Sequence, residues 1–333
     1  MSKKIRDNDY LFLSANLRAR ENKMVTRALL ERMLQTGSAA EAAHLLTDCG
    51  YPELSAVTHD SVTAMLNARR EALLRELAGL LPDSRVLTLF ALRSDYHNAK
   101  VIIKAAAMGT SGAGMAAGCG TVTYAAMEKL WLEGRPTELP DGLGEAMAEA
   151  GDILARTGDP QQADIALDRA YFARLTALAQ AMGSPFVAGY VRTLIDNANL
   201  RSAVRVVRMG RQASLMAAVL LPGGSASPQA VEAAVGRENG LAGLYGGTAL
   251  AKAAALGDGV LTGGSLTAFE TACDNGVTAY LAGARAVSFG VESAVAYLAA
   301  LDTEQTQIRI VLTGLISGVA ADTIRERLRD TYV

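Results

Sequence analysis

Apolar residues recur along most of the chain with the period of an α-helix. One face of the helix predicted over residues 21–37 gathers four apolar side chains: Met24, Ala28, Leu29 and Met33. Gly37 is placed to end that helix, and residues 61–81 continue the same period. Stretches that alternate apolar and polar residues are scarce. We therefore expect an all-α fold in which helices pack on helices.

Glycine and proline divide these helices. The Gly- and Pro-rich stretches 109–120, 134–144, 222–228 and 256–264 are predicted to be connections. Three helix starts share the pattern G-[ST]-x-[ST], and their glycines are Gly120, Gly224 and Gly264. Ser227 followed by Pro228 is a good N-cap with proline at the first helical position. Thr267 with Glu270 fits a capping box.

A longer motif occurs three times in fixed register. It consists of an acid, an amide three residues later, a base two residues after that, and a glycine nine residues beyond the base. The three copies are Asp95, Asn98, Lys100 and Gly109; Asp196, Asn199, Arg201 and Gly210; and Glu304, Gln307, Arg309 and Gly318. The copies follow each other at about one hundred residues, which indicates an internal repeat.

Acids on the preceding helices recur at a nearly constant distance from the motif. Asp168 and Asp274 lie on predicted helices 28 and 30 residues before the acids of the second and third copies. We therefore predict three similar helical bundles in a pseudo-three-fold arrangement that forms a funnel. Their boundaries are set at residues 1–118, 119–222 and 223–333.

The acid and the amide of each copy lie three residues apart and are neighbours on a helix. The base points about 140° away from the acid, given 3.6 residues per turn. One interpretation is a polar network that fixes helix register inside each bundle. The alternative is direct contact with a partner. His97 invites a role as general base beside Asp95, but Ala198 and Thr306 replace it in the other copies.

Cations form a second pattern on the motif helices. Arg201, Arg205 and Arg208 share one helix face, and Lys100 and Lys104 repeat the first two positions in the first copy. Arg309 keeps only the first position, because Thr313 replaces the second. These cations are candidates for a rim that meets an acidic partner. The alternative is that they extend into solvent or pair with the acidic segment 133–168.

Composition narrows the chemistry further. Half of the 333 residues are hydrophobic and the formal net charge is −2, which does not favour a nucleic-acid-binding surface. The three cysteines, Cys49, Cys119 and Cys273, form no C-x-x-C pair. The three histidines, His44, His59 and His97, lie far apart in sequence. We expect buried thiols, no metal site and no cofactor.

Nucleotide and catalytic motifs are absent as well. The Gly-rich stretches GTSGAGMAAGCG and GLYGGTALAK follow predicted helices and lack the G-K-[ST] ending of a phosphate loop. No G-x-S-x-G elbow occurs. The N-terminus has no apolar core of a secretory signal, and no apolar run approaches the length of a membrane span. We expect a non-catalytic, cytoplasmic protein without a direct membrane span.

Several segments resemble one known family. They are DYHNAKVIIKA, YVRTLIDNANLRSAVR, YLFLSANLRARENKM, GYPEL and above all FGVESAVAYLAALDTEQTQIRIVLTGLISGVAADTIRERLRDTYV. These are similar to the C subunit of the bacterial and archaeal V-type (A-type) ATPase, whose eukaryotic equivalent is the d subunit. The similarity covers nearly the whole chain and is weakest over residues 110–165. Glu304 and Gln307 depart from the shorter side chains of the other two copies.

The resemblance implies a non-catalytic coupling subunit. Such a subunit lies on the cytoplasmic face of the membrane rotor ring, receives the central stalk, and transmits torque for ATP-coupled H⁺ or Na⁺ transport. Its implied partners are the central-stalk subunits and the rotor ring, with no nucleic acid. Two other hypotheses stay open: a helical-repeat enzyme that uses Asp95, His97, Asp196 and Glu304 around a shared cavity, and a free-standing helical adaptor.

Overall fold

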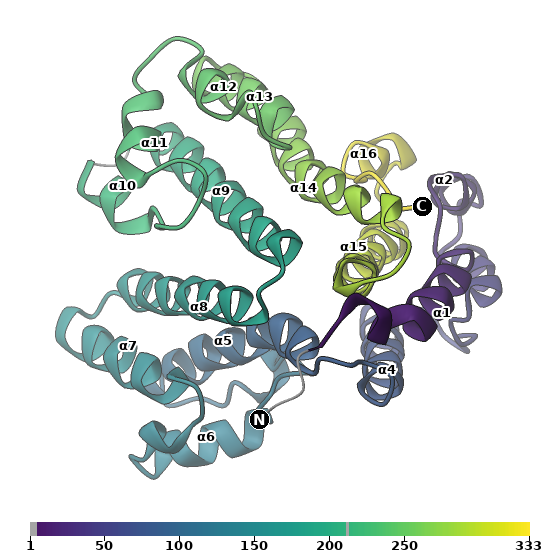
Figure 1. The fold of residues 1–333 in the computed structure, drawn as a ribbon, viewed down its shortest axis with the longest axis horizontal. Coiled ribbons are helices and arrows are strands. Elements are labelled where there is room, and N and C mark those ends of the chain that lie inside the picture. Colours follow the sequence, from purple (N-terminus) through teal and green to yellow (C-terminus); the bar gives the residue numbers. More distant parts are fainter. Residues whose placement is uncertain (1–4, 211–212) are drawn as a thin grey trace. The chain divides into compact units, whose positions relative to one another are not determined.

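The computed structural model describes residues 5–210 and 213–333, and within these ranges it is all-α, with no β-strand (Figure 1). The expectation of an all-α fold is confirmed. The α-helices are α1 Leu11–Glu21, α2 Arg27–Gln35, α3 Ala39–His44, α4 His59–Ala78, α5 Arg85–Ala107, α6 Tyr124–Leu132, α7 Leu143–Thr157, α8 Pro160–Met182, α9 Pro185–Arg208, α10 Ala213–Val219, α11 Pro228–Ala234, α12 Gly240–Tyr245, α13 Ala251–Leu261, α14 Leu266–Ala282, α15 Val291–Ile316 and α16 Ala321–Arg325. Five 3-10 turns join them: η1 Asp7–Tyr10, η2 Leu45–Cys49, η3 Ala113–Met115, η4 Pro136–Glu138 and η5 Gly283–Ala286.

The chain divides into two compact units. The larger unit contains the residues up to Leu73, Gly79–Pro82 and Arg192–Val333. The smaller unit contains Leu74–Ala78 and Asp83–Val191. Both α4 and α9 therefore contribute residues to each unit. The three bundle boundaries expected from the sequence stay a prediction.

The larger unit contains two apolar clusters. One joins the end of α9 to the helices from α10 to α14, and Tyr245 and Phe269 are its largest fully buried side chains. The other joins the N-terminal helices to the C-terminal ones: Leu30, Leu46 and Leu66 pack in one cluster with Ile308 and Val311 of α15. Segments from the two ends of the sequence thus share a core, and burying each such side chain contributes about 1.5–3 kcal/mol.

The smaller unit is built around α5. Helix α8 packs along α5, and α7 packs on both. Aromatic contacts reinforce this unit: the ring centroids of Tyr96 on α5 and Tyr171 on α8 lie 5.6 Å apart, and those of Phe90 on α5 and Tyr190 near the start of α9 lie 6.3 Å apart. Such pairs add about 0.5–1.5 kcal/mol beyond their burial.

Two local predictions about glycine and capping are wrong. Residues 256–261 belong to α13 and not to a connection. A side chain at Gly257 would lie 3.2 Å from Phe269, so this glycine permits close helix packing. The N-cap of α14 is Ser265, which accepts a hydrogen bond from the Ala268 N–H, and not Thr267. The Ser227 cap is confirmed, because its side chain accepts from the Ala230 N–H and proline follows it.

No helix within residues 5–210 and 213–333 combines the length and the apolar character that crossing a membrane requires.

Candidate functional site

The acid and the amide of each motif point into the protein from α5, α9 and α15. Their side chains are buried, with exposed fractions of 8% or less. Each pair holds a segment of backbone that lies outside its own helix, at least 19 residues away in sequence, and we call the pair with its hydrogen-bond partners a latch. Three latches recur, centred on Asp95 and Asn98, on Asp196 and Asn199, and on Glu304 and Gln307.

In the first latch, Asp95 binds the turn that precedes α6. Its carboxylate accepts hydrogen bonds from the Thr121 N–H at 3.1 Å, the Thr121 hydroxyl at 2.7 Å and the Val122 N–H at 3.2 Å. One turn along α5, the Asn98 amide donates to the Ala117 carbonyl at 3.0 Å and accepts from the Ala117 N–H at 2.8 Å. The latch therefore fixes the chain that leaves α5.

The second latch repeats this pattern on α9. Asp196 accepts from the Ser225 N–H at 2.8 Å, and the Ala226 N–H also donates to it. The Asn199 amide donates to the Leu221 carbonyl at 2.8 Å and accepts from the Leu221 N–H at 2.7 Å. Both the acid and the amide are buried, and both thus have the hydrogen-bond partners that buried polar groups require.

Glycine makes the first two latches possible. A Cβ added to Gly120 would lie 2.4 Å from an Asp95 oxygen, and one added to Gly224 would lie 2.3 Å from an Asp196 oxygen. Real Cβ atoms do not approach so closely, so any other residue here would push the backbone away from the acid. The first two glycine-led helix starts found in the sequence therefore lie against the acids of the first two motifs.

The third latch is assembled differently. Glu304 on α15 accepts from the Val25 N–H at 2.6 Å and from the Tyr51 hydroxyl at 2.6 Å. Gln307 donates its amide to the Arg329 carbonyl and accepts from the Arg329 N–H at 3.0 Å. The acid therefore binds the N-terminal part of the chain, and Gly264 has no part in this latch.

Sequence reasoning missed Val25 and Tyr51. A signal was present, because Thr26 directly after Val25 is the N-cap of α2 and accepts from the Leu29 N–H. Thr123 and Ser227 cap α6 and α11 in the same way, each directly after a residue whose N–H donates to the motif acid. The pattern of an apolar residue followed by a capping hydroxyl thus marks the backbone partner of each acid.

Burial raises the pKa of all three motif acids. Desolvation is the largest cause for Asp95, Asp196 and Glu304, and the hydrogen bonds that each carboxylate accepts oppose it. These carboxylates are almost entirely buried, so they offer little surface to a substrate. His97, in contrast, is exposed, and its Nε2 lies 3.0 Å from the Met115 carbonyl oxygen.

Ion pairs accompany the first two latches. We call the line along which a motif helix packs against its antiparallel neighbour a seam. In the seam of α5 and α8, Lys100 lies 2.6 Å from Asp168, and Lys104 lies 3.1 Å from Asp164. Two bases four residues apart thus face two acids four residues apart.

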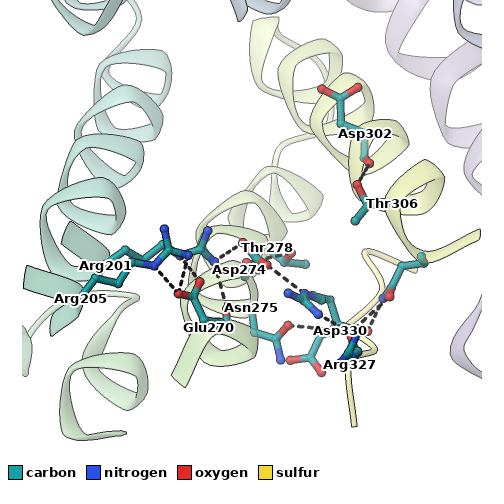
Figure 2. Close-up of polar contacts among 12 residues, drawn as sticks. Arg201, Arg205, Glu270, Asp274, Asn275, Thr278, Asp302, Thr306, Arg327 and Asp330 are labelled. Carbon is teal, nitrogen blue, oxygen red and sulfur yellow. Dashed lines mark hydrogen bonds and ion pairs between the residues drawn. The ribbon is translucent and has the colours of Figure 1, made fainter. Parts of the chain in front are cut away.

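The seam of α9 and α14 has the same arrangement. Figure 2 shows Arg201 and Arg205 extending from one helix toward Glu270 and Asp274 on the other. Arg201 lies 2.5 Å from Asp274, and Arg205 lies 2.7 Å from Glu270. Asp274 also accepts from Arg329 Nε at 2.9 Å, so it ties the C-terminal segment to this seam.

The cations proposed for a partner-facing rim are therefore engaged within the chain. Arg208 continues the series with a 3.5 Å hydrogen bond to the Gly264 carbonyl. Lys100 and Lys104 pair with acids at the end of the acidic segment, as the internal-pairing interpretation describes. Pairs of this kind that are open to solvent contribute about 0–1 kcal/mol each. Contact of these cations with a partner stays a prediction.

Within the part of the chain that the structure describes, no group of three or more His, Cys, Asp or Glu side chains is arranged to hold a metal ion. The expectation of buried thiols is confirmed for Cys49 and Cys273, which are buried free thiols, but it is wrong for Cys119, which is only partly buried. Burial raises the pKa of Cys49 to about 11 and that of Cys273 to about 12, so both are protonated at neutral pH.

The sequence is similar to C subunits of V-type and A-type ATPases and ATP synthases. Over 329 residues it is 22% identical to the C subunit of the V-type sodium ATPase of Enterococcus hirae, a match that covers 97% of this chain and 99% of that protein. It is 24% identical to the C subunit of the A-type ATP synthase of Methanocaldococcus jannaschii, covering 96% and 86%. A match to the C subunit of the V-type ATP synthase of Thermus thermophilus, at 23% identity, covers 61% and 65%. Residues 13–327 match the family described as ATP synthase (C/AC39) subunit, and the chain belongs to that family.

Proposed function

We propose that the chain is the non-catalytic coupling subunit of a rotary V-type or A-type ATPase. In this role it links the central-stalk subunits to the membrane rotor ring on the cytoplasmic face of the membrane. It transmits torque, so that ATP turnover is coupled to H⁺ or Na⁺ transport. The observation that carries the proposal is the family match over residues 13–327.

The latches support a mechanical role. A part that transmits torque must resist sliding of its helices, and each latch fixes a long helix, through a buried acid and a buried amide, to a segment at least 19 residues away in sequence. In the larger unit, Asp274 binds both Arg201 and Arg329, and Gln307 holds the backbone of Arg329. This series of contacts connects α9, α14, the C-terminal segment and α15. A load applied to one helix is thereby passed to the others.

Reconstitution tests the proposal. Stalk subunits, rotor ring and catalytic subunits are combined in vesicles with or without this chain. With the chain, we expect the stalk to co-purify with the ring and ATP to drive ion uptake. Without it, we expect ATP hydrolysis to continue while uptake is lost. Stalk–ring association and uptake that are unchanged in the absence of the chain would contradict the proposal.

A further inference from the structure

The third motif helix also has an antiparallel neighbour, which is α4. Gln305 donates its amide to the Leu66 carbonyl at 2.9 Å, and Asp302 forms an ion pair with Arg70. Farther along, the Ser317 hydroxyl lies 3.5 Å from His59 Nε2. Residue numbers rise along α15 as they fall along α4, so the pair forms a third seam in the larger unit.

The pairing of α15 with α4 shows which α4 residues occupy the positions that acids occupy in the other two seams. The contacts of residue 302 with 70 and of residue 317 with 59 place Arg309 beside the turn of α4 that contains Thr63 and Asn67. The repeat spacing agrees, because Asn67 precedes Asp95 by 28 residues, as Asp168 precedes Asp196. Neutral side chains therefore occupy both acid positions of the third seam.

The third seam contains the base Arg309, although α4 has no acid at the position that would pair with it. Arg309 is exposed, and so are Thr63 and Asn67. Within the described residues no hydrogen bond or ion pair engages the Arg309 side chain. The second base position holds Thr313, whose hydroxyl donates to the Arg309 carbonyl at 2.6 Å and is satisfied within its own helix. The third seam therefore presents a cation without an ion-pair partner in the described residues, beside neutral Thr63 and Asn67, with the nearest acid of this α4 face, Asp60, one turn beyond Thr63.

We propose that Arg309 is a docking point for a carboxylate on a central-stalk subunit, which completes the third seam from outside. The inference rests on the proposed function and specifies one contact of it. A guanidinium binds a carboxylate through two parallel hydrogen bonds, so the site favours an acidic side chain of a protein. An anionic membrane surface is a poorer match, because such surfaces attract clusters of four or more cations.

Charge reversal tests the contact. In the full-length chain, Arg309→Gln should weaken binding of the purified stalk subunits about fivefold, and Arg309→Glu about thirtyfold, at low ionic strength. The difference should shrink as salt is added, since salt screens exposed charges. Thermal unfolding should not change, because no intramolecular hydrogen bond or ion pair is removed. Arg237→Glu is the matched control: Arg237 is exposed, and its charge change is the same.

A second variant tests the seam argument itself. Asn67→Asp restores the acid that the other seams contain, and it should pair with Arg309 inside the chain. We expect it to weaken stalk binding about threefold and to raise the Tm slightly. Stalk binding that is unaffected by Asn67→Asp and by Arg309→Glu overturns this inference alone. Wild-type protein that does not bind the stalk overturns the proposed function and this inference with it.

The ring and lipid are controls for the identity of the partner. Arg309→Glu should leave binding to the isolated rotor ring and to phosphatidylserine vesicles unchanged. A loss confined to either of these would overturn the assignment to the stalk.

Discussion

The second and third latches both bind backbone through an acid and an amide of one helix, but their side chains differ. In the second, the short Asp196 reaches a turn whose Gly224 has no side chain, and a Cβ there would lie 2.3 Å from the carboxylate. Gly224 lies two residues before Ala226, whose N–H donates to the acid. In the third latch the donor is Val25, and the residue at the same position, two before it, is Lys23. Its acid and amide are Glu304 and Gln307, each one methylene longer.

The contrast shows that side-chain length and backbone approach are matched within each latch. Where glycine lets the turn come close, Asp and Asn suffice. Where the partner segment of the acid has side chains and comes from the other end of the sequence, the acid is the longer Glu304. The amide Gln307 is also one methylene longer, although its partner Arg329 lies 22 residues away, as Leu221 does from Asn199. The departure of the third motif from the first two is therefore a fitted replacement that preserves the same kind of hydrogen bonds.

Closing the space at glycine should break the second latch most severely. Gly224→Ala should lower the free energy of unfolding by about 4 kcal/mol, because its Cβ overlaps the Asp196 oxygen and separates the acid from the turn. Urea unfolding followed by circular dichroism measures this loss. Gly243→Ala in α12 is the control, since its Cβ would meet no atom within 4 Å. Equal stability of the two variants would refute the close-approach argument.

Removing an amide should cost somewhat less. Asn199→Ala leaves the Leu221 N–H and carbonyl buried without partners, and we expect a loss of about 3 kcal/mol. The same urea experiment on Gln307→Ala should give a smaller loss, since the Arg329 backbone is held in the same way but is only partly buried. If only one of the two variants is destabilised, the latches are not equivalent.

Shortening the acid of the third latch tests the matching of lengths. Glu304→Asp keeps the charge but withdraws the carboxylate from Val25 and Tyr51, which lowers the free energy of unfolding by about 2 kcal/mol. Tyr51→Phe removes one of the two hydrogen bonds and should cost about half as much. A Glu304→Asp variant as stable as wild type would show that length does not matter here.

A weaker consequence of the third latch is a dependence of stability on pH. The pKa of Glu304 is raised by burial above its ordinary value of 4.5, so the folded state holds the proton more tightly than the unfolded state. Stability from this group is full below pH 4.5 and falls as pH rises through the raised pKa. Compared with Glu304→Gln, which cannot ionise, wild type should lose more stability as pH rises above 4.5. Parallel pH profiles of the two proteins would contradict this.

The helical class and the register of the motif follow from the sequence alone. Helical periodicity is a local property, so the spacing of Asp95, Asn98 and Lys100 placed the acid and amide together and turned the base away. The same spacing in α9 and α15 predicted the recurrence. The cap at Ser227 was equally readable, because it depends on neighbouring residues alone.

What each group binds is set by tertiary packing. Glu304 meets Val25 across 279 residues of sequence, and Arg201 meets Asp274 on a helix that the motif does not contain. The sequence pattern assigned Gly257 to a connection. In the structure this glycine lets Phe269 pack close, and no local sequence pattern records such a contact. Such partners come from distant segments. The hydrogen bonds, ion pairs and packing contacts that select them form only when the helices pack together.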